Sequence, residues 1–334
     1  MVDAARPQDF LTRFLKDKHM QNILHRIDER PFLTDGGLET TLIFLDGIEL
    51  PHFASIAMLR TADGRAHLKR YFERYIAIAR GAGAGFILEA ATWRAGPDWA
   101  GPLGLELAEL DALNRDAIAL LHELRAEHQG EALPILISGC IGPRGDGYVA
   151  DRTMLADEAE AYHGHQVAVI AKAGVDLITA LTMTNVPEAI GIAKAALRAG
   201  LPVAISFTLE TDGRLPTGDG LKDAIEAVDA ATAGAPAYYM INCAHPSHFE
   251  AVLADAGEWV NRIRGLRANA SRLSHAELDE ATELDPGNPA ELARNYAELK
   301  ALLPALRVFG GCCGTDDRHV AAIADTCAAH ADRR

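Results

Sequence analysis

The sequence predicts a single (β/α)8 barrel, in which parallel strands alternate with helices. Eight apolar runs of four to seven residues recur along the 334-residue chain, and each run is apolar throughout rather than alternating. Such runs are typical of strands buried on both faces of a parallel sheet. Amphipathic helical patterns fill the gaps between the runs. A doubly wound open sheet is the alternative, but eight sequential units without a glycine-rich dinucleotide fingerprint favour the barrel.

The expected elements follow one another in a regular order. Between residues 106 and 128, for example, leucines and alanines recur at steps of three and four, as on one face of a helix. Ala-Gly phrases precede three of the strands, where the glycine suits a helix C-cap. The expected strands are 31–34, 85–88, 134–138, 175–181, 202–207, 238–241, 263–266 and 306–309. The expected helices are 64–80, 106–128, 156–172, 186–198, 221–233, 248–255, 289–302 and 317–329.

A barrel of this kind typically needs about 250 residues, which leaves roughly 80 over. We assign them to an N-terminal helical extension, residues 1–30, and to two long loops, 92–105 and 268–288. Residues 31–330 then form the barrel, and no shift in composition marks a second domain.

The overall charge excludes several classes of function. The chain has 32 Lys and Arg against 47 Asp and Glu, a net charge of −15, which argues against non-specific nucleic-acid binding and a polybasic membrane anchor. No apolar stretch reaches the roughly 18 residues of a membrane helix, and the N-terminus shows no signal peptide. Five cysteines, an odd number, fit a reducing cytoplasm. We expect a cytoplasmic enzyme with small-molecule partners, and both a monomer and a homo-oligomer are compatible with the sequence.

In a barrel the active site lies at the C-terminal ends of the strands. Asn242-Cys243 follows the sixth expected strand, and Gly310-Gly311-Cys312-Cys313-Gly314 follows the eighth. We therefore expect the three thiols to converge on one point, and three thiolates are a donor set that suits zinc with one open position. A vicinal disulfide is an alternative for the adjacent pair. Cys140 and Cys327 are expected to be buried apolar residues.

With these cysteine motifs, the chain resembles the zinc-dependent homocysteine S-methyltransferase family over nearly its whole length. Asn-Cys stands about 70 residues before Gly-Gly-Cys-Cys-Gly-Thr, as in that family. Supporting motifs are Asp35-Gly36-Gly37 within 34–42, Thr92-Trp93, 142–145, 206–207 and 212–218.

The resemblance implies that Cys243, Cys312 and Cys313 hold Zn²⁺ and that the thiol of the acceptor becomes the fourth ligand. A free thiol has a pKa of about 8.5, and coordination would deprotonate it for attack on the methyl group of an onium donor. S-methylmethionine or betaine would be such a donor, and homocysteine as acceptor would give methionine. Asp35, Gly36 and Gly37 would bind the amino-acid end of the acceptor, and Thr92, Trp93 and Asn242 are further candidate substrate-binding residues. Trp93 and Trp99 either offer an onium methyl an aromatic surface or pack the loop.

One position departs from the family, which usually has Glu-Thr after the fourth strand. Leu181 stands where that glutamate is expected, and a leucine cannot pair with an ammonium group. Either Glu89 or Glu210 substitutes, or the acceptor is another thiol or a selenol. Two more alternatives remain, a hydrolase with zinc-bound water and a non-catalytic zinc- or thiol-binding homologue. Among the histidines, His245 is a candidate neighbour of the metal, whereas His163 and His165 lie on opposite sides of a helix.

Overall fold

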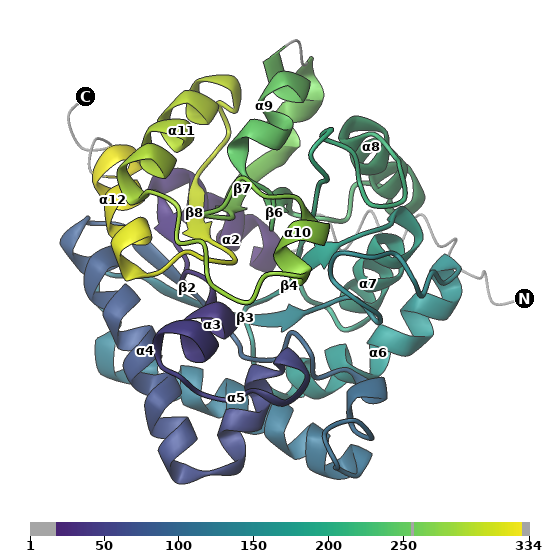
Figure 1. Cartoon of the computed structure of the whole chain (residues 1–334). Coiled ribbons are helices and arrows are strands. Elements are labelled where there is room, and N and C mark those ends of the chain that lie inside the picture. Colours follow the sequence, from purple (N-terminus) through teal and green to yellow (C-terminus); the bar gives the residue numbers. More distant parts are fainter. Residues whose placement is uncertain (1–17, 255–256, 329–334) are drawn as a thin grey trace, which may run out of the picture.

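The computed structural model describes residues 18–254 and 257–328 and confirms the predicted barrel. Its strands form a closed sheet in sequence order from β1 to β8, and the helices form a ring outside them (Figure 1). Every strand pair is parallel, and β1 closes the barrel because Phe32 pairs with both Gly85 and Val308. The structure describes one barrel in one domain.

Each of the eight strands lies at its predicted place. Four of them continue two or three residues past the apolar run, because small or polar residues such as Gly139, Arg267 and Gly311 remain paired at the C-terminal end. The strands are β1 Phe32–Leu33, β2 Gly85–Glu89, β3 Ile135–Ile141, β4 Leu177–Met183, β5 Val203–Phe207, β6 Tyr238–Asn242, β7 Ile263–Ala268 and β8 Val308–Gly311.

The predicted helices are present within a few residues of their expected bounds. They are α4 Ala62–Gly81, α5 Leu107–His128, α6 Ala156–Ala173, α7 Val186–Arg198, α8 Leu221–Thr232, α9 Pro246–Ala254, α11 Pro289–Leu302 and α12 Asp317–Cys327. The expected last residues of two of them, 255 and 329, lie outside the described residues. The glycines of the Ala-Gly phrases have positive φ, 66° at Gly83, 91° at Gly174 and 74° at Gly200, as helix ends of this kind require. In the described ranges, no helix combines the length and apolarity needed to cross a bilayer.

Short helices occupy the loops above the C-terminal ends of the strands. The loop 268–288 contains α10, His275–Asp279, which begins with a capping box between Ser274 and Glu277. The 3₁₀ turn Pro97–Trp99 lies in the loop 92–105, and α3, Leu38–Thr40, follows β1. Further single turns are Thr41–Leu45, Pro51–Phe53, Ser55–Arg60 and Glu258–Arg262.

A helix before the first strand closes the opposite end of the barrel. This helix, α2 Lys18–Glu29, buries Ile23 and Ile27 in one apolar cluster with Phe32, Tyr238 and Val308, which begin their strands or lie near the beginning. Apolar side chains therefore close the N-terminal ends of the strands, and the cavities described below lie at the C-terminal ends. Residues 1–17 of the expected extension lie outside the described residues.

Candidate active site

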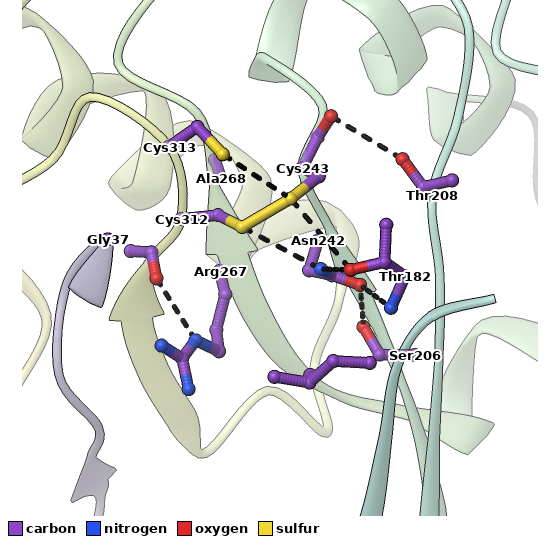
Figure 2. Close-up of a disulfide and its surroundings, with 12 residues drawn as sticks. Gly37, Thr182, Ser206, Thr208, Asn242, Cys243, Arg267, Ala268, Cys312 and Cys313 are labelled. Carbon is purple, nitrogen blue, oxygen red and sulfur yellow. Dashed lines mark hydrogen bonds between the residues drawn. A yellow bond between two sulfur atoms is a disulfide. The ribbon is translucent and has the colours of Figure 1, made fainter. Parts of the chain in front are cut away.

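The structure brings together the three cysteines of the predicted metal site. Cys243 follows β6, and Cys312 and Cys313 follow β8 (Figure 2). The Sγ atoms of Cys243 and Cys313 are 4.0 Å apart, and all three Sγ atoms lie within 4.8 Å of one another. A disulfide joins Cys243 to Cys312, so the bridge does not form between the adjacent pair that the sequence had suggested as an alternative.

The reduced form of this cluster fits a zinc ion. Zinc bound to tetrahedral thiolates at about 2.3 Å places the sulfur atoms about 3.8 Å apart. The 4.0 Å separation of Cys243 and Cys313 is close to that value, and three thiolates are the soft donors that zinc prefers. The Cys243–Cys312 disulfide has to be reduced before all three sulfurs can bind a metal. The other two cysteines are separate from the cluster, because Cys140 is a buried free thiol and Cys327 packs inside α12.

Asn242 fixes the backbone beside the thiols. Its Oδ1 accepts hydrogen bonds from the Thr182 N–H at 2.9 Å and the Ser206 hydroxyl at 2.6 Å. Its Nδ2 donates to Thr182 Oγ1 at 2.9 Å and to Cys312 Sγ at 3.7 Å. Thr182 and Cys243 have positive φ angles of 64° and 53°, which are costly for residues other than glycine and occur where surrounding contacts enforce them.

Glycines allow two loops to approach each other closely at this point. A Cβ on Gly37 would lie 2.5 Å from the carbonyl oxygen of Cys312, and one on Gly36 would lie 2.9 Å from that of Thr315. The Gly37 N–H donates to the Thr315 carbonyl oxygen at 3.0 Å. The Asp35-Gly36-Gly37 segment therefore lies directly against the cysteine loop because it lacks side chains there.

Two cavities meet at the thiol cluster. The inner cavity extends from the thiols toward the inside of the barrel. It is lined by Asp35, Gly36, Gly37, Leu38, Glu39, Thr40, Phe53, Glu89, Ala90, Trp93, Cys140, Leu181, Thr182, Asn242, Cys243, Arg267, Cys312 and Cys313. The outer cavity is covered by the loop 268–288, and Cys243 and Cys313 line it as well. Its other residues are Thr40, Phe44, Phe53, Trp93, Arg94, Asp146, Gly147, Tyr148, Thr182, Ser271, Leu278, Asp279, Ala281, Glu283, Leu284, Asp285 and Gly314.

Charged side chains are buried in the inner cavity. Arg267 Nη2 donates to Asp35 Oδ1 at 2.8 Å, and Tyr71 donates to Asp35 Oδ2 at 3.1 Å. Burial raises the pKa of Asp35, and the Arg267 charge opposes that shift. Burial also raises the pKa of Glu89, to about 7, with Arg267 again opposing. Sequence reasoning missed Arg267, although it follows an apolar run and lies at the C-terminal end of β7, where active-site residues are expected.

The outer cavity is acidic and partly aromatic. Its lining includes four carboxylates, and its one arginine, Arg94, pairs with Asp146 at 3.2 Å. Tyr148 donates to Cys313 Sγ at 3.3 Å and stacks on His275, with their ring centroids 4.2 Å apart. Sequence reasoning missed both residues, because each comes from a long loop and reaches the cluster only in the folded chain.

A model of the homocysteine S-methyltransferase family matches residues 32–327. The chain belongs to that family. It is 27% identical to homocysteine S-methyltransferase of Escherichia coli over 248 residues, 70% of this chain and 77% of that protein. It is 24% identical to homocysteine S-methyltransferase 3 of Arabidopsis thaliana over 247 residues, 66% of this chain and 70% of that protein.

The fold is shared with solved structures of the Escherichia coli homocysteine methyltransferase MmuM. The oxidised form superimposes with a TM-score of 0.70 at 22% identity, covering 92% of this chain and 99% of that one. The metallated form superimposes with a TM-score of 0.66 at 21% identity, and the same shares of the two chains are covered. Membership in the homocysteine S-methyltransferase family makes the chain a methyltransferase and confirms the resemblance found in its motifs.

The remaining predicted residues differ in whether they line the two cavities. Trp93 lines both cavities, and its Nε1 donates to the Leu181 carbonyl oxygen at 3.4 Å. Trp99 lines neither and packs beneath the Arg94 guanidinium, 4.7 Å from its ring centroid. Thr92 also lines neither, and its hydroxyl donates to the Cys140 carbonyl oxygen at 2.7 Å.

The histidines considered as metal ligands have other partners. His163 pairs with Glu188 and His165 with Asp111, both at 2.8 Å. His245 contacts Ser247, and His248 contacts the Arg272 carbonyl oxygen. The group of possible ligands found around Cys243 in the described residues contains only the three cysteines.

Proposed function

We propose that this methyltransferase is zinc-dependent and transfers a methyl group from an onium donor to the thiol of homocysteine, giving methionine. The observation that carries this proposal is the position of the thiol cluster, because Cys243 and Cys313 line both the inner and the outer cavity. Two substrates that occupy the two cavities would meet at the cluster. Homocysteine as acceptor is further supported by the names of the relatives.

The thiol cluster and the inner cavity would have different roles in the reaction. Zinc held by Cys243, Cys312 and Cys313 would keep the acceptor sulfur as a thiolate. The inner cavity, with its buried charges, would hold the polar end of the acceptor. Tyr148 donates a hydrogen bond to Cys313 and so lowers the electron density on that sulfur. In the transfer a sulfur–methyl bond forms and the onium–methyl bond breaks, and the thiol proton passes to solvent.

The outer cavity suits a cationic donor. Its carboxylates at Asp146, Asp279, Glu283 and Asp285 give it a negative potential that attracts a sulfonium or quaternary ammonium group. Trp93 and Phe53 add aromatic rings beside the thiols, and ring faces attract onium methyl groups. The donor would lose its positive charge on transfer, and the neutral product would then leave an acidic cavity readily.

A second candidate acceptor, another thiol or a selenol, is favoured by one observation. Leu181 lines the inner cavity, so the position expected to carry a glutamate is apolar. The zinc and onium chemistry would be the same for either acceptor.

The test is a methyl-transfer assay with reduced, zinc-loaded protein. Homocysteine, a plain alkanethiol and a selenol are each offered with S-methylmethionine or with betaine, and methylated products are measured. We expect methionine with at least one donor and none from the Cys313→Ser variant. Zinc-loaded protein that methylates none of the acceptors contradicts the proposal and favours a non-catalytic thiol-binding homologue.

A further inference from the structure

We propose that Glu89 and Arg267 together bind the amino-acid end of the acceptor, Glu89 its ammonium and Arg267 its carboxylate. The inference rests on the proposed function, which places a thiol amino acid in the inner cavity. It assigns the recognition of the ammonium to the end of β2 instead of the end of β4, where Leu181 stands.

Glu89 has the properties of a binding residue without its ligand. It is 5% exposed, it lines the inner cavity with the three thiols, and its Oε2 has no hydrogen-bond partner. No ion pair joins it to a basic side chain in the described residues. A buried carboxylate oxygen without a partner is costly, and an ammonium group in the cavity would supply the missing hydrogen bond and charge. Burial raises the pKa of Glu89 to about 7, although the charge of Arg267 and hydrogen bonding from Ser138 and Thr179 oppose that rise.

Arg267 offers the complementary charge. Its Nε donates to the Gly311 carbonyl oxygen at 3.0 Å, and its Nη2 donates to Asp35 at 2.8 Å and to the Gly36 carbonyl oxygen at 3.1 Å. Its Nη1 is buried and has no partner. A guanidinium is always charged, and its fork suits a carboxylate. The inner cavity is therefore lined by one carboxyl oxygen and one guanidinium N–H that have no partner, and together they complement the ammonium and the carboxylate of an amino acid.

The other carboxylates near the site are already occupied or lie elsewhere. Both oxygens of Asp35 accept hydrogen bonds, from Arg267 and Tyr71, so Asp35 acts by holding Arg267 in place. Glu39 accepts a hydrogen bond from Ser55 at 2.7 Å. Glu210 pairs with His275 at 3.0 Å and lines neither cavity. Of the two glutamates that the sequence left open, the structure favours Glu89.

The experiment measures binding to reduced, zinc-loaded protein by calorimetry, with three thiol probes. Homocysteine has both charged groups, 3-mercaptopropylamine lacks the carboxylate, and 4-mercaptobutanoate lacks the ammonium. Glu89→Gln is expected to weaken homocysteine and 3-mercaptopropylamine roughly tenfold or more and to leave 4-mercaptobutanoate unchanged. Arg267→Lys, which keeps a positive charge beside Asp35, is expected to weaken homocysteine and 4-mercaptobutanoate. Glu210→Gln is the matched control and should bind all three probes like the wild type.

Three results separate the possible failures. A folded Glu89→Gln variant that binds homocysteine with wild-type affinity overturns the inference while the proposed function stands. If the variants do not fold, the wild-type protein alone tests the inference. The inference is overturned if 4-mercaptobutanoate binds to the wild type as tightly as homocysteine does. A wild type that retains zinc but binds none of the probes refutes the proposed function itself.

Discussion

The side chain of Asn242 forms hydrogen bonds with both the backbone and the side chain of Thr182. The asparagine Oδ1 accepts from the Thr182 N–H, and its Nδ2 donates to the Thr182 hydroxyl, each at 2.9 Å. These two bonds hold a β-branched residue at φ 64° directly beside the cysteines. A buried side-chain amide that itself lines the inner cavity therefore holds the ends of β4 and β6 together at the site.

The first prediction concerns this amide. Asn242→Ala removes the partner of the buried Thr182 N–H and also that of the Ser206 hydroxyl, so we expect the free energy of unfolding to fall by about 2–4 kcal/mol. Ser206→Ala removes only one hydrogen bond and should cost about 1 kcal/mol. Urea unfolding of both variants measures the difference, and equal losses would show that Asn242 does not support Thr182.

The second prediction concerns the metal. Reduced protein should retain about one zinc per chain, and Cys312→Ser or Cys313→Ser should abolish retention because each removes one of three ligands. Elemental analysis after dialysis measures the zinc content. Cys140→Ser and Cys327→Ser are the controls, since neither thiol belongs to the cluster, and zinc loss in those variants would contradict the ligand assignment.

The third prediction concerns stability and pH. Glu89 has a pKa of about 7 in the folded protein, above the ordinary value of 4.5, so its ionisation opposes folding. The penalty is absent below pH 4.5, grows between pH 4.5 and 7, and is complete above pH 7. Glu89→Gln should therefore stabilise the ligand-free protein by about 1–3 kcal/mol at pH 8 and by much less at pH 5. Denaturant unfolding at the two pH values provides the comparison, and a variant less stable than wild type at pH 8 would refute it.

The fourth prediction concerns Leu181. Since Glu89 already lines the inner cavity, Leu181→Glu adds a second buried carboxylate there, and we expect kcat/KM for homocysteine to fall. In the Glu89→Gln background the same change should restore part of the lost efficiency, because one carboxylate again faces the ammonium. Steady-state kinetics of the two single variants and the double variant measure this coupling. An increase in the wild-type background would mean that Glu89 does not serve the acceptor.

The fifth prediction concerns the donor. Asp279→Asn with Glu283→Gln removes two negative charges from the outer cavity, so KM for a cationic donor should rise several-fold at low salt and less at high salt. The affinity for the acceptor thiol should not change. Asp157→Asn, an exposed carboxylate on α6 that lines neither cavity, is the control, and an equal effect there would point to overall charge.

The fold was readily predictable because each strand is a short apolar run and each helix carries local signals. The ends of the strands were harder to predict. Gly139, Arg267 and Gly311 are paired with neighbouring strands, yet they interrupt the apolar pattern by which a strand is recognised. The short helix α10 was missed, although the Ser274–Glu277 capping box is a local signal for it.

The site was predictable where residue type and strand position sufficed, as for the three cysteines. It was not predictable where partners decide the role of a side chain. Glu89 and Glu210 each stand at or after the end of an apolar run, and the structure distinguishes them because Glu89 lines the inner cavity whereas Glu210 pairs with His275 from a distant loop. The bridge between Cys243 and Cys312 likewise depends on the relative positions of β6 and β8.

The pairing of β1 with β8 determines when the site can form during synthesis. Cys312 and Cys313 directly follow β8, the last strand of the barrel and the one that closes it against β1. A nascent chain without β8 has an open sheet and only one of the three thiols. Closure of the barrel and completion of the cluster are therefore a single late folding event that depends on contacts between the first and the last strand of the barrel. A ligand that requires all three thiols can bind only the finished barrel, and its binding energy stabilises this last step against reopening.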